Sequence, residues 1–149
     1  PVSFLKHNLL LADDDTDDVT FFKEALNELP VEASLSTVND GVQLMHYLTS
    51  TALKLPDLLY LDLNMPLKSG VECLDEIKQN DTIKQLPVII FTTAFNMEVV
   101  DLVYQKGAHY FIRKPGEYSQ LKKIIYESLT LITKNQLKQP PREEFILQP

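Results

Sequence analysis

Four short apolar runs in the sequence each end in a polar residue that can take part in chemistry. Residues 8–12, 58–61, 88–91 and 109–113 have the length and composition of β-strands. They lead into Asp13-Asp14-Asp15, Asp62, Thr92-Thr93 and Lys114-Pro115, respectively. If these strands lie side by side in a parallel sheet, the polar residues meet at the sheet edge where such sheets bind ligands. The sequence therefore predicts a site that can hold a divalent cation and transfer a phosphoryl group.

The segments between these runs alternate between helix and strand. Apolar residues recur at helical spacing over residues 16–29, 69–79, 96–106 and 117–134, and a further helix follows the turn at 39–41 and runs through residue 48. Residues 33–38 form one more short strand. Five strands alternating with five helices predict a flavodoxin-like α/β fold, a doubly wound parallel sheet in the order 2-1-3-4-5. We expect one domain over residues 1–134 and a C-terminal tail over residues 135–149.

The composition of the chain argues against nucleic acid and membranes as partners. The 149 residues carry 14 basic and 21 acidic side chains, and no basic patch for nucleic acid is visible. No apolar run reaches the roughly 18 to 20 residues that span a bilayer, and the amino-terminal residues do not resemble a signal peptide. The single Cys73 cannot form an internal disulfide. These features favour a cytoplasmic protein without nucleic-acid or membrane partners.

Asp62 is the strongest candidate for chemistry. It follows an apolar strand, which holds its carboxylate beside other acids, and a carboxylate can attack phosphorus to form an aspartyl phosphate. The alternative is an ordinary loop or capping Asp. Asp13 and Asp14 could likewise only cap the helix that follows, and Lys114 could be a solvated surface charge. Asp15, Asp17 and Asp18 are expected to do no more than cap.

Several landmarks occur in the order found in a known family. The chain resembles the receiver domain of two-component response regulators over residues 7–133, through Asp13-Asp14, the segment 61–66 with Gly70, Thr92, and Lys114-Pro115. The resemblance implies that Asp62 is the phosphoacceptor and that Lys114 contacts the phosphoryl group. It also implies a Mg²⁺ site made by Asp14, Asp62 and the backbone carbonyl of Asn64, with Asp13 acting through water, and a cis peptide before Pro115.

The resemblance further implies a switch and a partner. Thr92 would be the switch hydroxyl, and Phe111 its aromatic partner, without the hydroxyl of the Tyr that many relatives carry. A histidine kinase would donate the phosphoryl group, and the length and tail resemble regulators paired with phytochrome kinases. We expect a stand-alone response regulator, a phosphoacceptor switch rather than an enzyme, which catalyses its own phosphorylation and dephosphorylation. Its output would pass to a downstream protein target or a phosphotransfer protein.

Apolar residues beyond the needs of one core predict a homodimer. In the helix at 96–106 one apolar stripe, Val99, Leu102 and Val103, suffices to cover a sheet. A second stripe is either interface or partly buried core. An apolar tail segment at 145–147, which a lone domain would leave in water, adds to the same surface. The expected interface residues are Met97, Val100, Tyr104, Tyr118 and Tyr126.

Two other functions fit parts of the sequence. A phosphohydrolase of the aspartate-nucleophile type carries Asp-x-Asp after its first strand, whereas Asp62 follows the predicted third strand. A phosphorylation-independent interaction module would not need Asp14, Asp62, Thr92 and Lys114 together. Phosphorylation with a small donor such as acetyl phosphate distinguishes the three.

Overall fold

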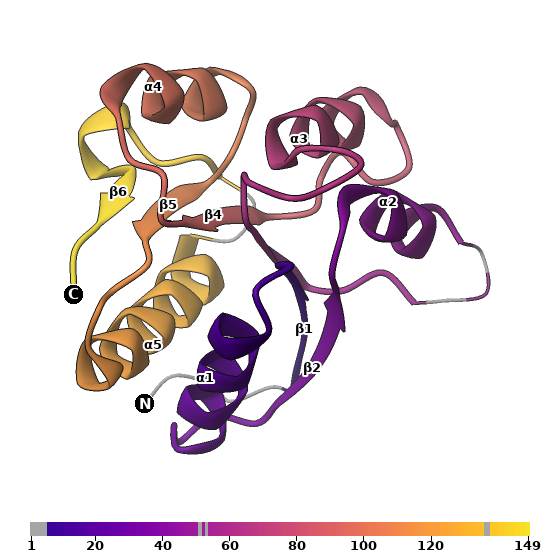
Figure 1. Ribbon diagram of the computed structural model, residues 1–149. Helices are drawn as coiled ribbons and strands as arrows, with labels where there is room; N and C mark the ends of the chain where they lie inside the picture. Colours follow the sequence, from indigo (N-terminus) through magenta and orange to yellow (C-terminus); the bar gives the residue numbers. More distant parts are fainter. Residues whose placement is uncertain (1–5, 51, 53, 136–137) are drawn as a thin grey trace.

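Six parallel strands form the centre of the molecule (Figure 1). The computed structural model describes residues 6–50, 52, 54–135 and 138–149. Strand order in the sheet is β2-β1-β3-β4-β5-β6. The strands are β1 (His7–Ala12), β2 (Ala33–Val38), β3 (Leu58–Leu61), β4 (Val88–Thr92), β5 (Tyr110–Arg113) and β6 (Ile146–Leu147). The helices are α1 (Thr16–Asn27), α2 (Gly41–Thr49), α3 (Gly70–Gln79), α4 (Met97–Gln105) and α5 (Tyr118–Asn135), with a 3₁₀ turn, η1, at Arg142–Glu144.

Helices cover both faces of the sheet. α1 and α5 lie on one face, and α2, α3 and α4 lie on the other (Figure 1). The central strands β3 and β4 are buried along their whole length, because successive side chains point into the two opposite cores. The predicted flavodoxin-like order 2-1-3-4-5 and the five helices are confirmed.

Polar residues fix the helix ends close to where the sequence predicts them. Asp15 is the N-cap of α1 and accepts hydrogen bonds from the N–H groups of Asp17 and Asp18. Ser69 caps α3 in a capping box with Glu72. These local signals set the start of the helices that follow β1 and β3, and therefore the position of the loops that carry the acidic residues.

The tail adds the sixth strand, which the sequence analysis did not expect. β6 pairs in parallel with β5, so that Ile146 lies opposite Phe111. The side chain of Phe145 is fully buried, and its ring lies 4.9 Å from the ring of Tyr104 in α4. The expectation that residues 145–147 would be left in water is therefore wrong, because pairing with β5 places Phe145 in the core under α4 and Leu147 in the core on the α1 and α5 face.

The predicted interface residues do not form one surface. Val100 is fully buried in the core, whereas Leu102, which was expected to face inward, is 40% exposed. Tyr118 bonds through its hydroxyl to Glu28, just after α1, and Tyr126 lines a shallow hollow beside the end of α1. These two tyrosines lie on the α1 side of α5 because the carboxyl end of α1 packs there.

None of the helices among the described residues combines the length and the apolar character needed to cross a membrane. The boundary between the domain and its tail, expected between residues 134 and 135, stays a prediction.

Candidate functional site

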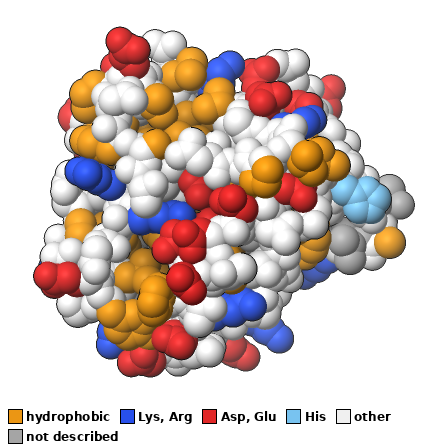
Figure 2. Space-filling view, in the orientation of Figure 1, with side chains coloured by type: hydrophobic (Ala, Val, Ile, Leu, Met, Phe, Trp, Pro, Cys, Tyr) orange, Lys and Arg blue, Asp and Glu red, His pale blue; other side chains and the backbone are white. Residues whose placement is uncertain are grey.

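Three carboxylates meet at the carboxyl edge of the sheet. Asp13 and Asp14 follow β1, Asp62 follows the neighbouring β3, and one oxygen atom of each lies within 4.8 Å of the others. The backbone N–H of Asp62 donates to the carbonyl of Ala12 at 3.0 Å, which locks the two strand ends together. Asp13 and Asp62 are buried and Asp14 is exposed. Acidic side chains gather near the centre of the face seen in Figure 2, next to a basic side chain.

A glycine allows the loop after Asp62 to fold tightly against α3. A Cβ atom on Gly70 would lie 2.2 Å from the carbonyl oxygen of Asp62, so that any other residue would displace this backbone. The N–H of Gly70 donates to the carbonyl of Leu63 at 2.9 Å. The N–H of Asn64 donates to Oδ1 of Asp62 at 3.3 Å and orients the carboxylate. The predicted role of the Asn64 carbonyl as a metal ligand remains a prediction.

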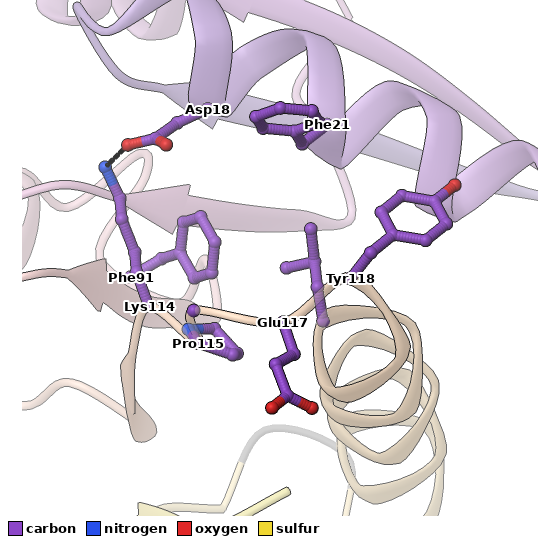
Figure 3. A pocket seen from close by; sticks show the side chains of 9 residues that line it. Asp18, Phe21, Phe91, Lys114, Pro115, Glu117 and Tyr118 are labelled. Carbon is purple, nitrogen blue, oxygen red and sulfur yellow. Dashed lines mark hydrogen bonds and ion pairs between the residues drawn. The ribbon is translucent and has the colours of Figure 1, made fainter.

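Lys114 reaches this cluster from the end of β5. Its Nζ atom lies 2.7 Å from Oδ2 of Asp13 and 3.2 Å from Oδ2 of Asp62. A third partner is Oδ2 of Asp18 at 2.8 Å, the contact drawn in Figure 3. The same ammonium lies 5.5 Å from the centre of the Phe91 ring. Lys114 is therefore part of the site and not a solvated surface charge.

Asp18 is a residue of the site that sequence reasoning missed. It was expected only to favour the start of α1, yet it also forms an ion pair with Lys114. No local signal in the sequence marks this role, because Asp18 lies in the first turn of α1 and its partner Lys114 is 96 residues away in the sequence.

Burial and crowding shift the proton affinities of the site. Burial raises the pKa of the Asp13 carboxyl to about 6, against the opposing effects of Lys114 and of the Asp15 N–H. Burial alone lowers the pKa of Lys114, but its carboxylate partners outweigh this effect and raise the pKa above its ordinary value. Carboxylates held this close disfavour one another's charge unless cations neutralise them.

The donor set fits a divalent cation. All three clustered side chains offer oxygen atoms, the ligands that Mg²⁺ and similar hard cations prefer. Oδ2 of Asp13 is buried and accepts no well-directed hydrogen bond from the described residues, although the Lys114 ammonium lies close to it. Within the described residues, Lys114 is the one basic side chain paired with these acids, so negative charge remains in excess.

The two predicted switch residues are buried on the same face of the sheet. Thr92 ends β4, and its Oγ1 atom accepts a hydrogen bond from the N–H of Ala94 at 3.4 Å. Phe111 on β5 lies opposite Ile90, two residues before Thr92, so that Phe111 and Thr92 point into the same core. The peptide bond before Pro115 is trans, and the expected cis bond is wrong.

A cavity of about 170 Å³ opens beside Lys114, between α1 and the start of α5 (Figure 3). Its walls include Phe21, Phe91 and Leu121, and the Lys114–Asp18 ion pair closes one side. The charged site therefore lies next to a cavity with partly apolar walls.

Residues 9–126 match the profile of the response regulator receiver domain. Because this match covers most of the chain, the protein belongs to the receiver domain family of response regulators, the phosphoacceptor switches of two-component phosphorelay systems. The family was predicted from the sequence, and the match confirms it.

Two response regulators, one of them a phytochrome response regulator, are among the similar proteins. The chain is 31% identical to the response regulator Rcp1 of Synechocystis over 121 residues, which are 78% of this chain and 82% of Rcp1. The Mn²⁺-bound form of Rcp1 superposes with a TM-score of 0.76 at 28% identity, covering 91% of this chain and 99% of that one. The phosphorylated cyanobacterial phytochrome response regulator RcpA superposes with a TM-score of 0.78 at 30% identity, covering 92% of this chain and 100% of RcpA.

Proposed function

We propose that this protein accepts a phosphoryl group on Asp62 from the phosphohistidine of a histidine kinase. The observation that supports this proposal best is the contact between Lys114 and Asp62, 3.2 Å apart within a cluster of carboxylates that suits a divalent cation. A phosphohydrolase of the aspartate-nucleophile type is less consistent with the acceptor following β3. An interaction module without phosphorylation would not require this cluster.

In the proposed reaction, an oxygen atom of Asp62 attacks the phosphorus atom of the phosphohistidine. A bond forms between this oxygen and phosphorus, and the bond between phosphorus and the imidazole nitrogen breaks. The nitrogen keeps the electron pair and takes a proton from water. The N–H of Asn64 holds the Asp62 carboxylate in position, and the Lys114 ammonium lies where it can contact an oxygen of the transferred group.

The metal in this proposal is Mg²⁺. Asp14, Asp62 and the backbone carbonyl of Asn64 would hold it, and Asp13 would contribute through water. Bound Mg²⁺ would neutralise charge on the phosphoryl oxygens. A relative that is similar over most of its length has been solved with Mn²⁺ bound, which supports a divalent ion of this kind.

The change in the protein would begin at Thr92. Its hydroxyl oxygen accepts a hydrogen bond from the nearby N–H of Ala94, and we propose that the hydroxyl turns to donate a hydrogen bond to the phosphoryl group. Phe111, in the same core on the next strand, would then change its packing. The altered surface would be read by a downstream protein target or a phosphotransfer protein.

Incubation with acetyl phosphate and Mg²⁺, followed by intact-mass measurement, tests the proposed acceptor. We expect one added phosphoryl group on the native protein and none on Asp62→Asn. Asp81→Asn, a change at a highly exposed acid near the end of α3, is the matched control and should behave like the native protein. Modification of Asp62→Asn to the same extent as the native protein would refute Asp62 as the acceptor. Rapid release of phosphate from many phosphoesters by the native protein would support the phosphohydrolase. A native protein that is not modified at all would support the interaction module.

The proposed kinase is of the phytochrome type. Support comes from the similarity to RcpA, which is a phytochrome response regulator, and to Rcp1. A panel of purified histidine kinases loaded with labelled phosphate would test this choice. Transfer to Asp62 should be fastest from a phytochrome kinase, and equal or faster transfer from unrelated kinases would reject it. This partner also implies a cytoplasmic location.

We also propose a homodimer, on a smaller surface than the sequence predicted. Met97 and Leu102 of α4 and Phe95 before it are each at least 39% exposed, and burial of these exposed apolar side chains would favour a two-fold dimer. Light scattering should show a dimer that Met97→Glu weakens. Val42→Glu, at a similarly exposed position of α2, is the control. A monomer at high concentration, with and without phosphorylation, would rule the dimer out.

A further inference from the structure

The C-terminal tail lies directly on the predicted switch residue. The backbone N–H of Phe111 donates to the carbonyl of Phe145 at 3.0 Å, and the two rings lie 6.2 Å apart. Both side chains are fully buried in the same core, under α4. The tail is therefore joined to Phe111 through both backbone and side chain.

Polar contacts hold the rest of the tail against α4. The Tyr104 hydroxyl donates to the carbonyl of Pro140 at 2.7 Å. The side-chain amide of Gln139 donates to the carbonyls of Tyr104 and Ala108, each at 2.8 Å. Arg142 forms an ion pair with Asp101 at 2.8 Å. The tail is thus docked by several contacts, and α4 is the element that receives most of them.

Two aromatic rings lie next to the buried ring of Phe111. The ring of Phe95, in the loop that joins β4 to α4, lies 5.9 Å from it, and the ring of Phe145 lies 6.2 Å from it. Thr92 points into the same core from the neighbouring strand. Because interiors are close-packed, Phe111 cannot move toward Thr92 without changing the contacts that hold Phe145.

We propose that residues 138–149 form an autoinhibitory strap that opposes phosphorylation of Asp62 while it is docked. This inference rests on the proposed function. Phe145 packs against Phe111 in its present position. When Thr92 shifts toward a phosphoryl group on Asp62 and Phe111 moves toward Thr92, a void is left beneath the tail. Phosphorylation then weakens docking of the tail, and by thermodynamic reciprocity the docked tail weakens phosphorylation.

Amide hydrogen exchange on the full chain, before and after treatment with acetyl phosphate and Mg²⁺, tests the first half of the inference. We expect exchange of residues 143–147 to become faster by about fivefold or more on phosphorylation. Intact mass measured on the same samples separates the two proposals. An added phosphoryl group with unchanged exchange would overturn the strap alone, whereas no added group would overturn the proposed function and the strap together.

Point variants test the second half. Phe145→Ala removes the ring that packs near Phe111, and we expect the folded variant to bind the phosphoryl mimic beryllofluoride, in the presence of Mg²⁺, about fivefold more tightly. Tyr104→Phe removes only the hydrogen bond to Pro140 and should give a smaller gain in affinity while preserving the core. Glu143→Ala, at an exposed position of the tail, is the control and should leave the affinity unchanged. If Phe145→Ala does not fold, Tyr104→Phe decides; native affinity in the folded variants would refute the strap.

Discussion

The Nζ atom of Lys114 lies 2.7 Å from Oδ2 of Asp13, an acid whose side chain is buried near the other end of the chain. This contact joins the end of β5 to the end of β1, although β3 and β4 lie between them in the sheet. It also brings one positive charge to a crowded group of carboxylates. The stability of this edge of the sheet should therefore depend on the Lys114 ammonium.

Replacing Lys114 with Met tests that dependence. With the ammonium gone, buried carboxylates lose their partner, and we expect a marked fall in the melting temperature in the presence of a chelator. Added Mg²⁺ should recover much of the loss, because the cation restores positive charge. Lys122→Met, which removes an ion pair with Glu28 on the surface, is the control and should change little. Equal losses in the two variants would contradict the prediction.

Asp14 and Asp15 are neighbours with different expected roles. Asp14→Ala should abolish Mg²⁺-dependent phosphorylation and the rise in melting temperature on adding Mg²⁺, because Asp14 is the predicted direct ligand. Asp15→Ala removes the N-cap of α1, so we expect a loss of about 1 kcal/mol in the free energy of unfolding with phosphorylation retained. Thermal melts with and without Mg²⁺, beside intact-mass measurements, check both. Similar loss of the Mg²⁺ response in the two variants would mean that the metal ligand is wrongly assigned.

Thr92→Ala tests transmission from the phosphoryl group to the surface. The variant should still accept the phosphoryl group but should lose the phosphorylation-dependent change in amide exchange of α4. A coupling of about 1–3 kcal/mol would be lost. Thr93→Ala, at the exposed neighbouring position, should keep the response. A native response in Thr92→Ala would reject the proposed switch.

The hydroxyl of Tyr60 lies 2.6 Å from Oγ of Ser128 in the core between β3 and α5. Ser128 also donates to the carbonyl of Ile125 at 2.8 Å. Ser128→Ala therefore leaves the buried Tyr60 hydroxyl without this partner and should cost about 1–3 kcal/mol in the free energy of unfolding. Tyr60→Phe leaves Ser128 bonded and should cost less, and the double variant should recover part of the Ser128→Ala loss. Urea unfolding of the native protein and the three variants measures these losses in the free energy of unfolding. A double variant whose loss equals the sum of the two single losses would contradict the prediction.

Cys73 should be inert in the folded protein. Burial raises the pKa of its thiol to about 12, so that only roughly one molecule in ten thousand carries the thiolate at pH 8. Its sulfur also donates to the carbonyl of Gly41. We expect alkylation by iodoacetamide only after denaturant unfolds the protein, as followed by intact mass. Rapid labelling under native conditions would show that α3 opens locally.

The sequence by itself determined the first five strands, the five helices and those members of the site that directly follow the strands. Strand ends and helix caps are local signals, so the residue pattern alone was enough to assign Asp14, Asp62 and Lys114 to one sheet edge. The parallel order then brought these residues together, because the carboxyl ends of parallel strands share an edge. The family match over residues 9–126 confirms the family, and the roles of these residues stay predictions.

Only the tertiary structure decided which apolar and charged side chains contact residues that are distant in the sequence. Asp18 could cap a helix in isolation, and its ion pair with Lys114 exists because β5 ends beside α1. Phe145 has the character of an interface residue in the sequence, but in the fold Tyr104 and Phe111 surround it. Burial of a tail depends on a groove made by distant segments, and no local pattern in residues 135–149 encodes that groove.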